Sequence, residues 1–307
     1  MRLIRRRYQN EEDYWRIRAF LRRLFVLHER RWMCWPVYRW DYWRWHANVN
    51  IWRFSLEAAV FLWETGDGQL AAVLHPNGPG EAILQVHPAY RSPDLEVEMM
   101  NTAETQFAIS HQGAQRLTIW AHQCDALRQD LLARRGFSRE PGREIQFRRS
   151  LEGPAPDCQP PAGYTVRALG DDAELPARGW LSWKTLHTGQ PVEQYAGWQW
   201  YRNVQAAPLY RRDLDLVAIA PDGELAAFCT LWFDDVTRMA ACEPVGVHPA
   251  HRGQGLGKAM VAEGMRRAAR LGATVCTATV SAGEANAFYA ALGFAEHELS
   301  EPWVKVW

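Results

Sequence analysis

Apolar and polar residues alternate along the second half of the chain in a pattern that predicts a regular series of elements. Two alternating runs, 214–220 and 224–233, flank a Pro-Asp-Gly sequence that is typical of a hairpin turn. A strand is expected over about 238–247, and an amphipathic pattern predicts a helix over about 255–271 that ends at Gly272. The other expected strands are about 164–169, 273–280 and 295–306, and the other expected helices run from Asp171 or Asp172 to about 187, from Pro191 to about 206, and over 284–292.

The first half of the chain repeats the second half at an offset of about 155–162 residues. Five blocks match in the same order: 3–5 with 165–167, 43–48 with 198–203, 67–72 with 222–227, 86–91 with 247–252, and 135–137 with 292–294. A segment rich in proline and glycine separates the halves. The sequence therefore predicts two domains of one fold, 1–150 and 163–307, joined by a linker at 151–162.

The most informative stretch reads EPVGVHPAHRGQGLGK and covers residues 243–258. It leads from a strand through a glycine-rich loop into the N-terminus of a helix, where glycines admit positive φ and the free N–H groups favour an anion. The sequence is not a P-loop, because it lacks G-x-x-x-x-G-K-[ST], and Arg252 stands where the dinucleotide fingerprint has its first glycine. The stretch therefore predicts a phosphate-binding loop of another kind.

This loop resembles the R-x-x-G-x-G signature of the GNAT superfamily of acetyltransferases. A Val-x-Pro sequence precedes it, and Asn286 to Phe294 is similar to the family pattern N-x-x-(F/Y)-Y-x-x-x-G-F. The resemblance covers about 163–307 and implies an α/β chain of two GNAT-like domains, each a mixed, mostly antiparallel sheet flanked by helices. It also implies an enzyme that transfers the acetyl group of acetyl-CoA to a primary amine of a small molecule.

The family pattern, carried over residue by residue, implies two catalytic side chains. Glu243 corresponds to the general base, and a carboxylate on a half-buried strand is expected to have a raised pKa. Tyr289 corresponds to the acid that protonates the departing thiolate. The alternative for Glu243 is a structural hydrogen bond or ion pair, and the alternative for Tyr289 is packing beside Phe288.

The same resemblance implies a set of acetyl-CoA contacts. The loop amides are expected to hold the pyrophosphate, the preceding strand to pair with the pantetheine arm and polarise the thioester carbonyl, and Asn286 to bond the arm. The expected contact residues are Val245, Gly246, Val247, Arg252, Gly253, Gln254, Gly255, Leu256, Gly257, Lys258 and Asn286. No metal site is expected, because the cysteines have no metal-ligand spacing.

The first half lacks the residues that this chemistry needs. Ser92-Pro93-Asp94-Leu95-Glu96 replaces the glycine loop, and Leu132 stands opposite Tyr289. The proline removes an amide donor, and the two carboxylates put negative charge where a pyrophosphate would lie. The first half is therefore expected to be a degenerate, structural copy, with an independent ligand as the alternative.

The sequence contains sixteen tryptophans, and their clusters allow two interpretations of the acceptor site. Packing is the first interpretation for the clusters at 32–52 and 180–200, and a cage for a cationic or aromatic ligand is the second. Trp183, Trp198 and Asp234 are the candidate acceptor contacts.

Bulk composition limits the partners and the location. The formal net charge is 0, which gives no global basic field for nucleic acid. The N-terminus has no apolar signal region, no run of about 18 apolar residues predicts a membrane span, and the unpaired cysteines favour the cytoplasm. Two alternatives remain: an acyltransferase similar to mycothiol synthase that acts on a cysteinyl or amino-sugar amine, and a non-catalytic CoA-binding regulatory module. The oligomeric state is open.

Overall fold

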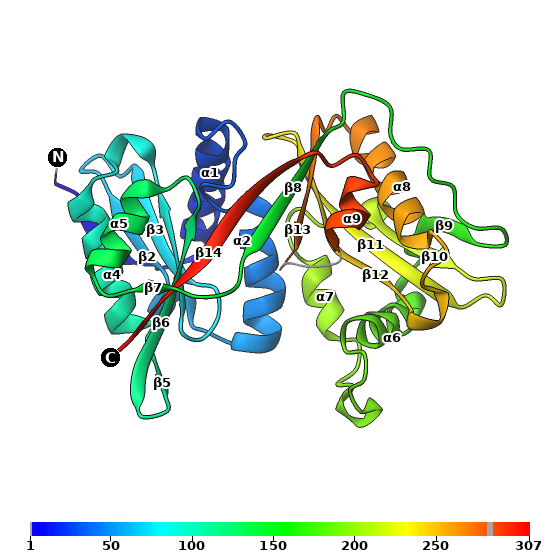
Figure 1. Cartoon of the computed structure of the whole chain (residues 1–307), viewed down its shortest axis with the longest axis horizontal. Coiled ribbons are helices and arrows are strands. Elements are labelled where there is room, and N and C mark those ends of the chain that lie inside the picture. Colours follow the sequence, from blue (N-terminus) through cyan, green and yellow to red (C-terminus); the bar gives the residue numbers. More distant parts are fainter. Residues whose placement is uncertain (1, 281–284) are drawn as a thin grey trace. The chain divides into compact units, whose positions relative to one another are not determined.

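The computed structural model describes residues 2–280 and 285–307 and divides them into two compact units (Figure 1). The first unit comprises 2–43, 47–145 and 298–307, and the second comprises 44–46, 146–280 and 285–297. The C-terminal strand thus groups with the first half of the chain, and residues 146–150 group with the second half. The boundary at 150 that the sequence predicts therefore differs from the observed grouping of these two segments. Alternation of apolar and polar residues predicts a strand, but it does not identify the strand with which that strand pairs.

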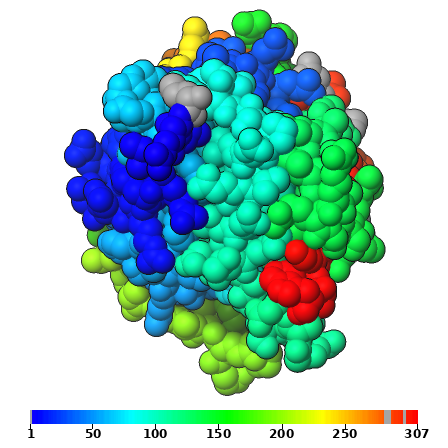
Figure 2. Space-filling model, turned by 90° about the vertical axis from the view of Figure 1, so that its left-hand side faces the viewer, coloured from blue at the N-terminus to red at the C-terminus, as the bar shows by residue number. Residues whose placement is uncertain are grey.

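The sheet of the first unit is antiparallel except at one pair of strands. Its strands follow the order β1-β2-β3-β4-β6-β14, β4 and β6 are parallel, and β5 and β7 pair with β6 and β14. The bounds are β1 Ile4–Arg7, β2 Phe61–Glu64, β3 Leu70–Pro76, β4 Glu81–Val86, β5 Ile109–His111, β6 Ala114–His122, β7 Ser138–Arg139 and β14 Glu296–Val306. Figure 2 shows atoms of the C-terminal residues (red) at the surface among atoms of the first half.

The three longest α-helices of the first unit begin at side-chain caps. The helices of this unit are α1 Glu11–Leu27, α2 Val37–Tyr42, α3 Leu56–Ala59, α4 Pro93–Gln106 and α5 Ala126–Arg134, with a π-helix over Trp43–Trp52. Asn10, Ser92 and Asp125 accept hydrogen bonds from the first turns of α1, α4 and α5. The core lies between the sheet and these helices, and Trp63 and Met99 are completely buried in it.

The second unit has the same kind of sheet. Its strands follow the order β8-β13-β12-β11-β10-β9, in which β12 and β13 are parallel and β9 to β12 are antiparallel neighbours. The strands are β8 Glu144–Ser150, β9 Thr165–Ala168, β10 Asp215–Ile219, β11 Leu225–Asp234, β12 Met239–Val247 and β13 Val275–Val280; the helices are α6 Leu175–Leu186, α7 Trp200–Gln205, α8 Leu256–Arg270 and α9 Ala285–Ala290. The predicted mixed, mostly antiparallel α/β fold is confirmed.

Most of the predicted boundaries agree with the structure, and one helix does not. Gly223 and Gly272 have φ of 91° and 100°, as the expected hairpin and helix end require. The predicted helix from Pro191 to 206 is wrong. A 3₁₀ turn over Val192–Gln194 and the short α7 replace it, because Gly197 between them has a left-handed φ of 91°.

Local hydrogen bonds support the internal repeat. β4 and β12 both end at a His-Pro sequence, and each histidine accepts through Nδ1 from the amide two residues later. The distances are 3.2 Å for His87 with Ala89 and 3.3 Å for His248 with Ala250. A 3₁₀ turn follows in both halves. The two halves therefore make the same turn at the end of the same strand.

Candidate active site

The glycine-rich loop of the second unit leads directly into the N-terminus of α8. Gly253 and Gly255 have φ of 79° and 83°, a conformation that side chains other than glycine rarely adopt. Gly255 is the N-cap, and no side chain among the described residues caps the helix there. A Cβ at either glycine would have no described atom within 4 Å, so the loop backbone faces open space. This arrangement leaves N–H groups available to an anion.

Two further loop residues have contacts that fix the turn. Arg252 is exposed, and its Nε donates to the carbonyl oxygen of Val247 at 3.1 Å. Tyr164 Oη lies 2.8 Å from His251 Nδ1. Arg252 thus keeps a positive charge beside the loop while it also holds the end of β12. Gln254 is exposed, and Leu256 and Gly257 are buried at the start of α8.

β12 separates from β13 just before the predicted catalytic residues. The parallel ladder joins Met239–Ala241 to Val275–Thr277, and Glu243 lies beyond it. The register with β11 also shifts between Cys229 and Leu231, which places an irregularity opposite Glu243. A strand segment with a free edge can pair with an extended ligand. The segment from Glu243 to Val247 therefore has the geometry expected of a pantetheine-binding strand.

Close packing around Gly246 leaves no room for a side chain. A Cβ at this position would lie 2.5 Å from both Phe228 Cζ and Thr185 Cγ2. Gly257 is tight as well, because a Cβ on it would lie 3.3 Å from both Phe288 Cε2 and Val247 Cγ2. Both glycines therefore bring neighbouring elements together, whereas Gly253 and Gly255 provide backbone conformation.

Tyr289 lies on α9 in an aromatic environment and is 6% exposed. Its ring stacks on Phe147 at a centroid distance of 5.5 Å and meets the edge of Phe294 at 5.3 Å. Burial raises the pKa of the Tyr289 phenol well above its usual value of 10.0, and nearby groups that include Cys242 and Glu243 raise it further. The phenol is therefore protonated at neutral pH, as a proton donor must be.

Glu243 is half-buried on β12, and its backbone is held by an indole. Trp232 Nε1 donates to the carbonyl oxygen of Glu243 at 2.6 Å. Glu243 is one of the nearby groups that raise the pKa of Tyr289, so it lies close enough to affect the phenol. That the two side chains act in one site stays a prediction.

The three candidate acceptor contacts have structural partners. Trp183 stacks on His187 at a centroid distance of 4.0 Å, and Trp198 packs against Gly179. Asp234 is buried at the end of β11, and its carboxylate accepts from both N and Oγ1 of Thr237. These bonds stabilise the β11–β12 hairpin and are sufficient to explain an aspartate at this position. A contact between Asp234 and the substrate stays a prediction. Asn286 is exposed on α9, and the half-buried Lys258 lies on α8.

The corresponding loop of the first unit is closed by its own side chains. Ser92 Oγ accepts from Leu95 N at 3.2 Å and caps α4. Glu96, which is completely buried, bonds to Arg91 Nε at 2.8 Å and to Arg128 Nη2 at 2.9 Å. Arg91 corresponds to Arg252 in the repeat. A carboxylate of the chain itself therefore neutralises Arg91, whereas its counterpart Arg252 lies beside an open loop.

Comparison with known proteins agrees with this geometry. The acetyltransferase (GNAT) family matches residues 178–294. A mycothiol acetyltransferase of Kineococcus radiotolerans is 30% identical over 217 residues, which are 66% of this chain and 67% of that protein. One of Streptomyces coelicolor is 29% identical over 242 residues, which are 73% and 70% of the two chains.

The chain belongs to the GNAT acetyltransferase family. Two solved structures have the same fold over nearly the whole chain. A tandem GNAT protein from the clavulanic acid biosynthesis pathway has a TM-score of 0.69 at 16% identity, with 99% of this chain and 98% of that chain covered. A GNAT acetyltransferase from Sphaerobacter thermophilus has a TM-score of 0.68 at 17% identity, with 99% and 95% covered. The protein is thus an acetyltransferase with the tandem GNAT architecture.

Two residues of this GNAT site were not predicted from the sequence. No motif indicates Trp232, although the sequence predicts the strand that carries it, beside the strand of Glu243. A domain boundary at 150 places Phe147 in the first domain, whereas the structure groups it with the second unit. The alternation of Ile145 and Phe147, both buried, was the available signal.

Two absences apply to the described part of the chain. No helix within 2–280 and 285–307 is long and apolar enough to cross a membrane. The same residues contain no group of three or more His, Cys, Asp or Glu side chains that could hold a metal ion.

Proposed function

We propose that the second unit transfers the acetyl group of acetyl-CoA to a primary amine of a small-molecule acceptor. The observation that carries this proposal is the open, uncapped N-terminus of α8 directly after the strand that bears Glu243. Loop amides at 252–257 hold the pyrophosphate, aided by Arg252 and Lys258. Val245 to Val247 pair with the pantetheine arm through their backbone, and Asn286 bonds it from α9.

Glu243 and Tyr289 then divide the proton transfers between them. The acceptor amine attacks the thioester carbonyl carbon, Glu243 removes a proton from the nitrogen, and the C–S bond breaks. Tyr289 donates its phenolic proton to the sulfur and later regains one from solvent. Burial raises the pKa of Tyr289, so the phenol keeps its proton until a thiolate forms beside it.

The acceptor class follows from the relatives by analogy. Both curated relatives are named mycothiol acetyltransferases. A cysteinyl or amino-sugar amine is therefore the second, narrower candidate. We place the reaction in the cytoplasm, because all six cysteines are free thiols, as expected in a reducing compartment. The first unit binds no CoA in this proposal, so each chain binds one molecule.

Thiol release from acetyl-CoA in the presence of a panel of amines tests the proposal. The panel contains simple alkylamines, amino sugars and cysteinyl amides, and the Tyr289→Phe variant is measured beside the wild type. Acceptor-dependent release that falls in the variant supports the proposal. Tight CoA binding without release for any amine would favour the non-catalytic CoA-binding module instead.

A further inference from the structure

The first unit contains a cavity where β4 and β6 separate. The parallel ladder of these strands joins Glu81 to Thr118 and Ala82 to Ile119, and the lining residues of the cavity come after it on both strands. The cavity has a volume of about 50 Å³. The same divergence, between β12 and β13, occurs at the catalytic site of the second unit. The first unit therefore keeps the separation of the two parallel strands, although Glu96 neutralises the arginine beside its loop.

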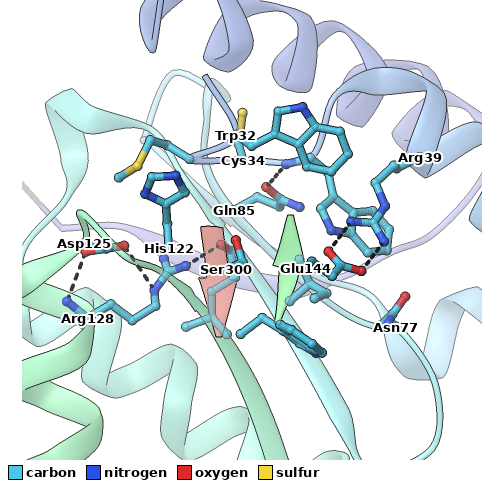
Figure 3. Close-up of a pocket in the computed structure, with 15 residues that line it drawn as sticks. Trp32, Cys34, Arg39, Asn77, Gln85, His122, Asp125, Arg128, Glu144 and Ser300 are labelled. Atoms are coloured by element: carbon cyan, nitrogen blue, oxygen red, sulfur yellow. Dashed lines mark hydrogen bonds and ion pairs between the residues drawn. The ribbon is translucent and has the colours of Figure 1, made fainter. Parts of the chain in front are cut away.

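Gln85 presents a hydrogen-bond donor in this cavity. The side chain is 1% exposed, and its Oε1 accepts from the backbone N of Trp35 at 3.0 Å. A backbone N–H can only donate, so the oxygen must face Trp35 and Nε2 must face the other way. Nε2 has no acceptor among the residues that the structure describes. Figure 3 shows Gln85 between His122 and the pair formed by Arg39 and Glu144.

His122 and Trp120 add donors from β6. His122 is 5% exposed, and its Nδ1 accepts from Cys124 N at 3.1 Å, which assigns the ring proton to Nε2. Burial lowers the pKa of His122, so the ring is neutral at pH 7. Neither His122 Nε2 nor Trp120 Nε1 has a hydrogen-bond acceptor within the described part of the chain. The carboxylate of Glu298 lies 3.9 Å from His122 Nε2, beyond hydrogen-bond distance, and its charge is paired with Arg31. Trp32, which also lines the cavity, has an Nε1 that likewise has no acceptor among the described residues. Four lining side chains thus offer five N–H bonds without acceptors.

The charged groups around the cavity are already paired. Arg39 bonds to both oxygens of Glu144 at 2.9 Å, and Arg128 Nη2 bonds to Glu96 at 2.9 Å. Asp125 accepts from Arg91 at 2.6 Å. Because these charges are paired, the groups of the cavity that still need a partner are N–H donors, and a ligand must supply acceptor atoms. The guanidinium of Arg39 also lies 4.9 Å from the ring centre of Trp35, which fixes an apolar wall.

We propose that this cavity binds a short-chain carboxylate of two or three carbons, with the carboxylate accepting from Gln85 Nε2, His122 Nε2 and Trp120 Nε1. A carboxylate has about four lone-pair sites, which is enough for the N–H bonds of Gln85, His122 and Trp120, whereas a neutral carbonyl has two. A volume of about 50 Å³ holds three to five groups of the size of a water molecule, and acetate has four heavy atoms. Coenzyme A is not the ligand, because the adjoining loop carries Glu96.

Titration of the full-length protein with sodium acetate at constant ionic strength tests this site. Calorimetry gives the affinity, and the indole N–H resonance of Trp120, assigned by its loss in Trp120→Phe, reports the location. We expect saturable binding with a Kd between about 0.05 and 5 mM, which is the range that four heavy atoms permit. The Trp120 resonance should move with the same Kd.

Two variants and one control separate the site from unspecific binding. Gln85→Glu keeps the acceptor for Trp35 but replaces the donor, and it should weaken acetate binding about tenfold or more. Trp120→Phe keeps an aromatic ring but removes the indole N–H, and it should weaken binding severalfold. Trp303→Phe removes another buried indole N–H without a described acceptor, outside the cavity lining, and should leave the affinity unchanged.

Several results would overturn the assignment. One is a Trp120 resonance that does not move at 50 mM acetate, which would mean that the donors are satisfied by water. Another is equal loss of affinity in the Trp303→Phe control. A third is displacement of acetate from Trp120 by coenzyme A, which would make the cavity a CoA site. None of these results depends on turnover in the second unit.

Discussion

Replacement of Gly255 by glutamate should abolish CoA binding while the protein still folds. Gly255 has a φ of 83°, and a side chain in the left-handed region costs about 1–2 kcal/mol. A Cβ there meets no described atom within 4 Å, so no steric cost is added. A negative charge at the N-terminus of α8 recovers about 0.3–1 kcal/mol. The free energy of unfolding should therefore fall by only about 1 kcal/mol.

The effect on binding should be much larger. A carboxylate at about 5 Å from a phosphate charge costs roughly 1–3 kcal/mol when the effective dielectric constant lies between about 80 and 20. A pyrophosphate carries two such charges, so the total is about 2–7 kcal/mol. Every 1.4 kcal/mol is about a tenfold change, and the Kd for CoA should therefore rise at least about 30-fold.

Calorimetry with coenzyme A and urea unfolding measure the two effects separately. Gly255→Gln is the matched control, because glutamine has the size and the backbone strain of glutamate without its charge. We expect the glutamine variant to bind CoA markedly better than the glutamate variant, although it lacks the charge at the helix N-terminus and should be less stable by about 0.3–1 kcal/mol. If both variants bind CoA as the wild type does, the loop before α8 is not the phosphate site.

Three further predictions concern the catalytic pair and the closed loop of the first unit. Tyr289→Phe should lower turnover by roughly 10- to 1000-fold with little change in acetyl-CoA affinity, in steady-state kinetics. Glu243→Gln should flatten the rise of kcat/KM with pH; a rise that survives the substitution and follows the pKa of the acceptor amine would remove Glu243 from the mechanism. Glu96→Gln should lower the free energy of unfolding by about 3–5 kcal/mol at pH 7, because it leaves Arg128 and Arg91 with one carboxylate fewer. Burial acts to raise the pKa of Glu96, but the charges and hydrogen bonds of Arg128 and Arg91 together outweigh it, so the pKa is lowered from 4.5 in the fold. Wild-type stability should therefore fall as the pH drops below about 5, and the variant should lose part of this slope in urea titrations at pH 7 and pH 4.

Local features of the site were predictable because they depend on few residues. The loop at 253–257 combines glycines with a strand before it and an amphipathic helix after it, and each of these patterns constrains φ and ψ over a short stretch. Observed bounds for β12 and α8 are within one residue of the predicted ones. The resemblance of Asn286 to Phe294 to the family then indicated Tyr289.

The tryptophans show why side-chain function is harder to predict. Trp40 and Trp43 are buried and stacked at a centroid distance of 5.1 Å, with His75 packed against both. Packing is therefore sufficient to explain these two residues. By contrast, the indole N–H of Trp120 indicates a ligand site only because the structure shows no acceptor for it among the described residues. Hydrogen-bond partners depend on distant segments, and spacing along the chain does not contain them.

The sequence by itself determined the repeat, the order of most elements, the glycine-rich loop before α8 and the family, because all of these are encoded in local patterns and short motifs. Tertiary structure alone decided that β14 pairs with β6, that Phe147 packs on Tyr289, and that Glu96 neutralises the loop of the first unit. Strands share one alternation and can pair with many partners, so the choice among them is made by packing and by the burial of charge over long sequence distances.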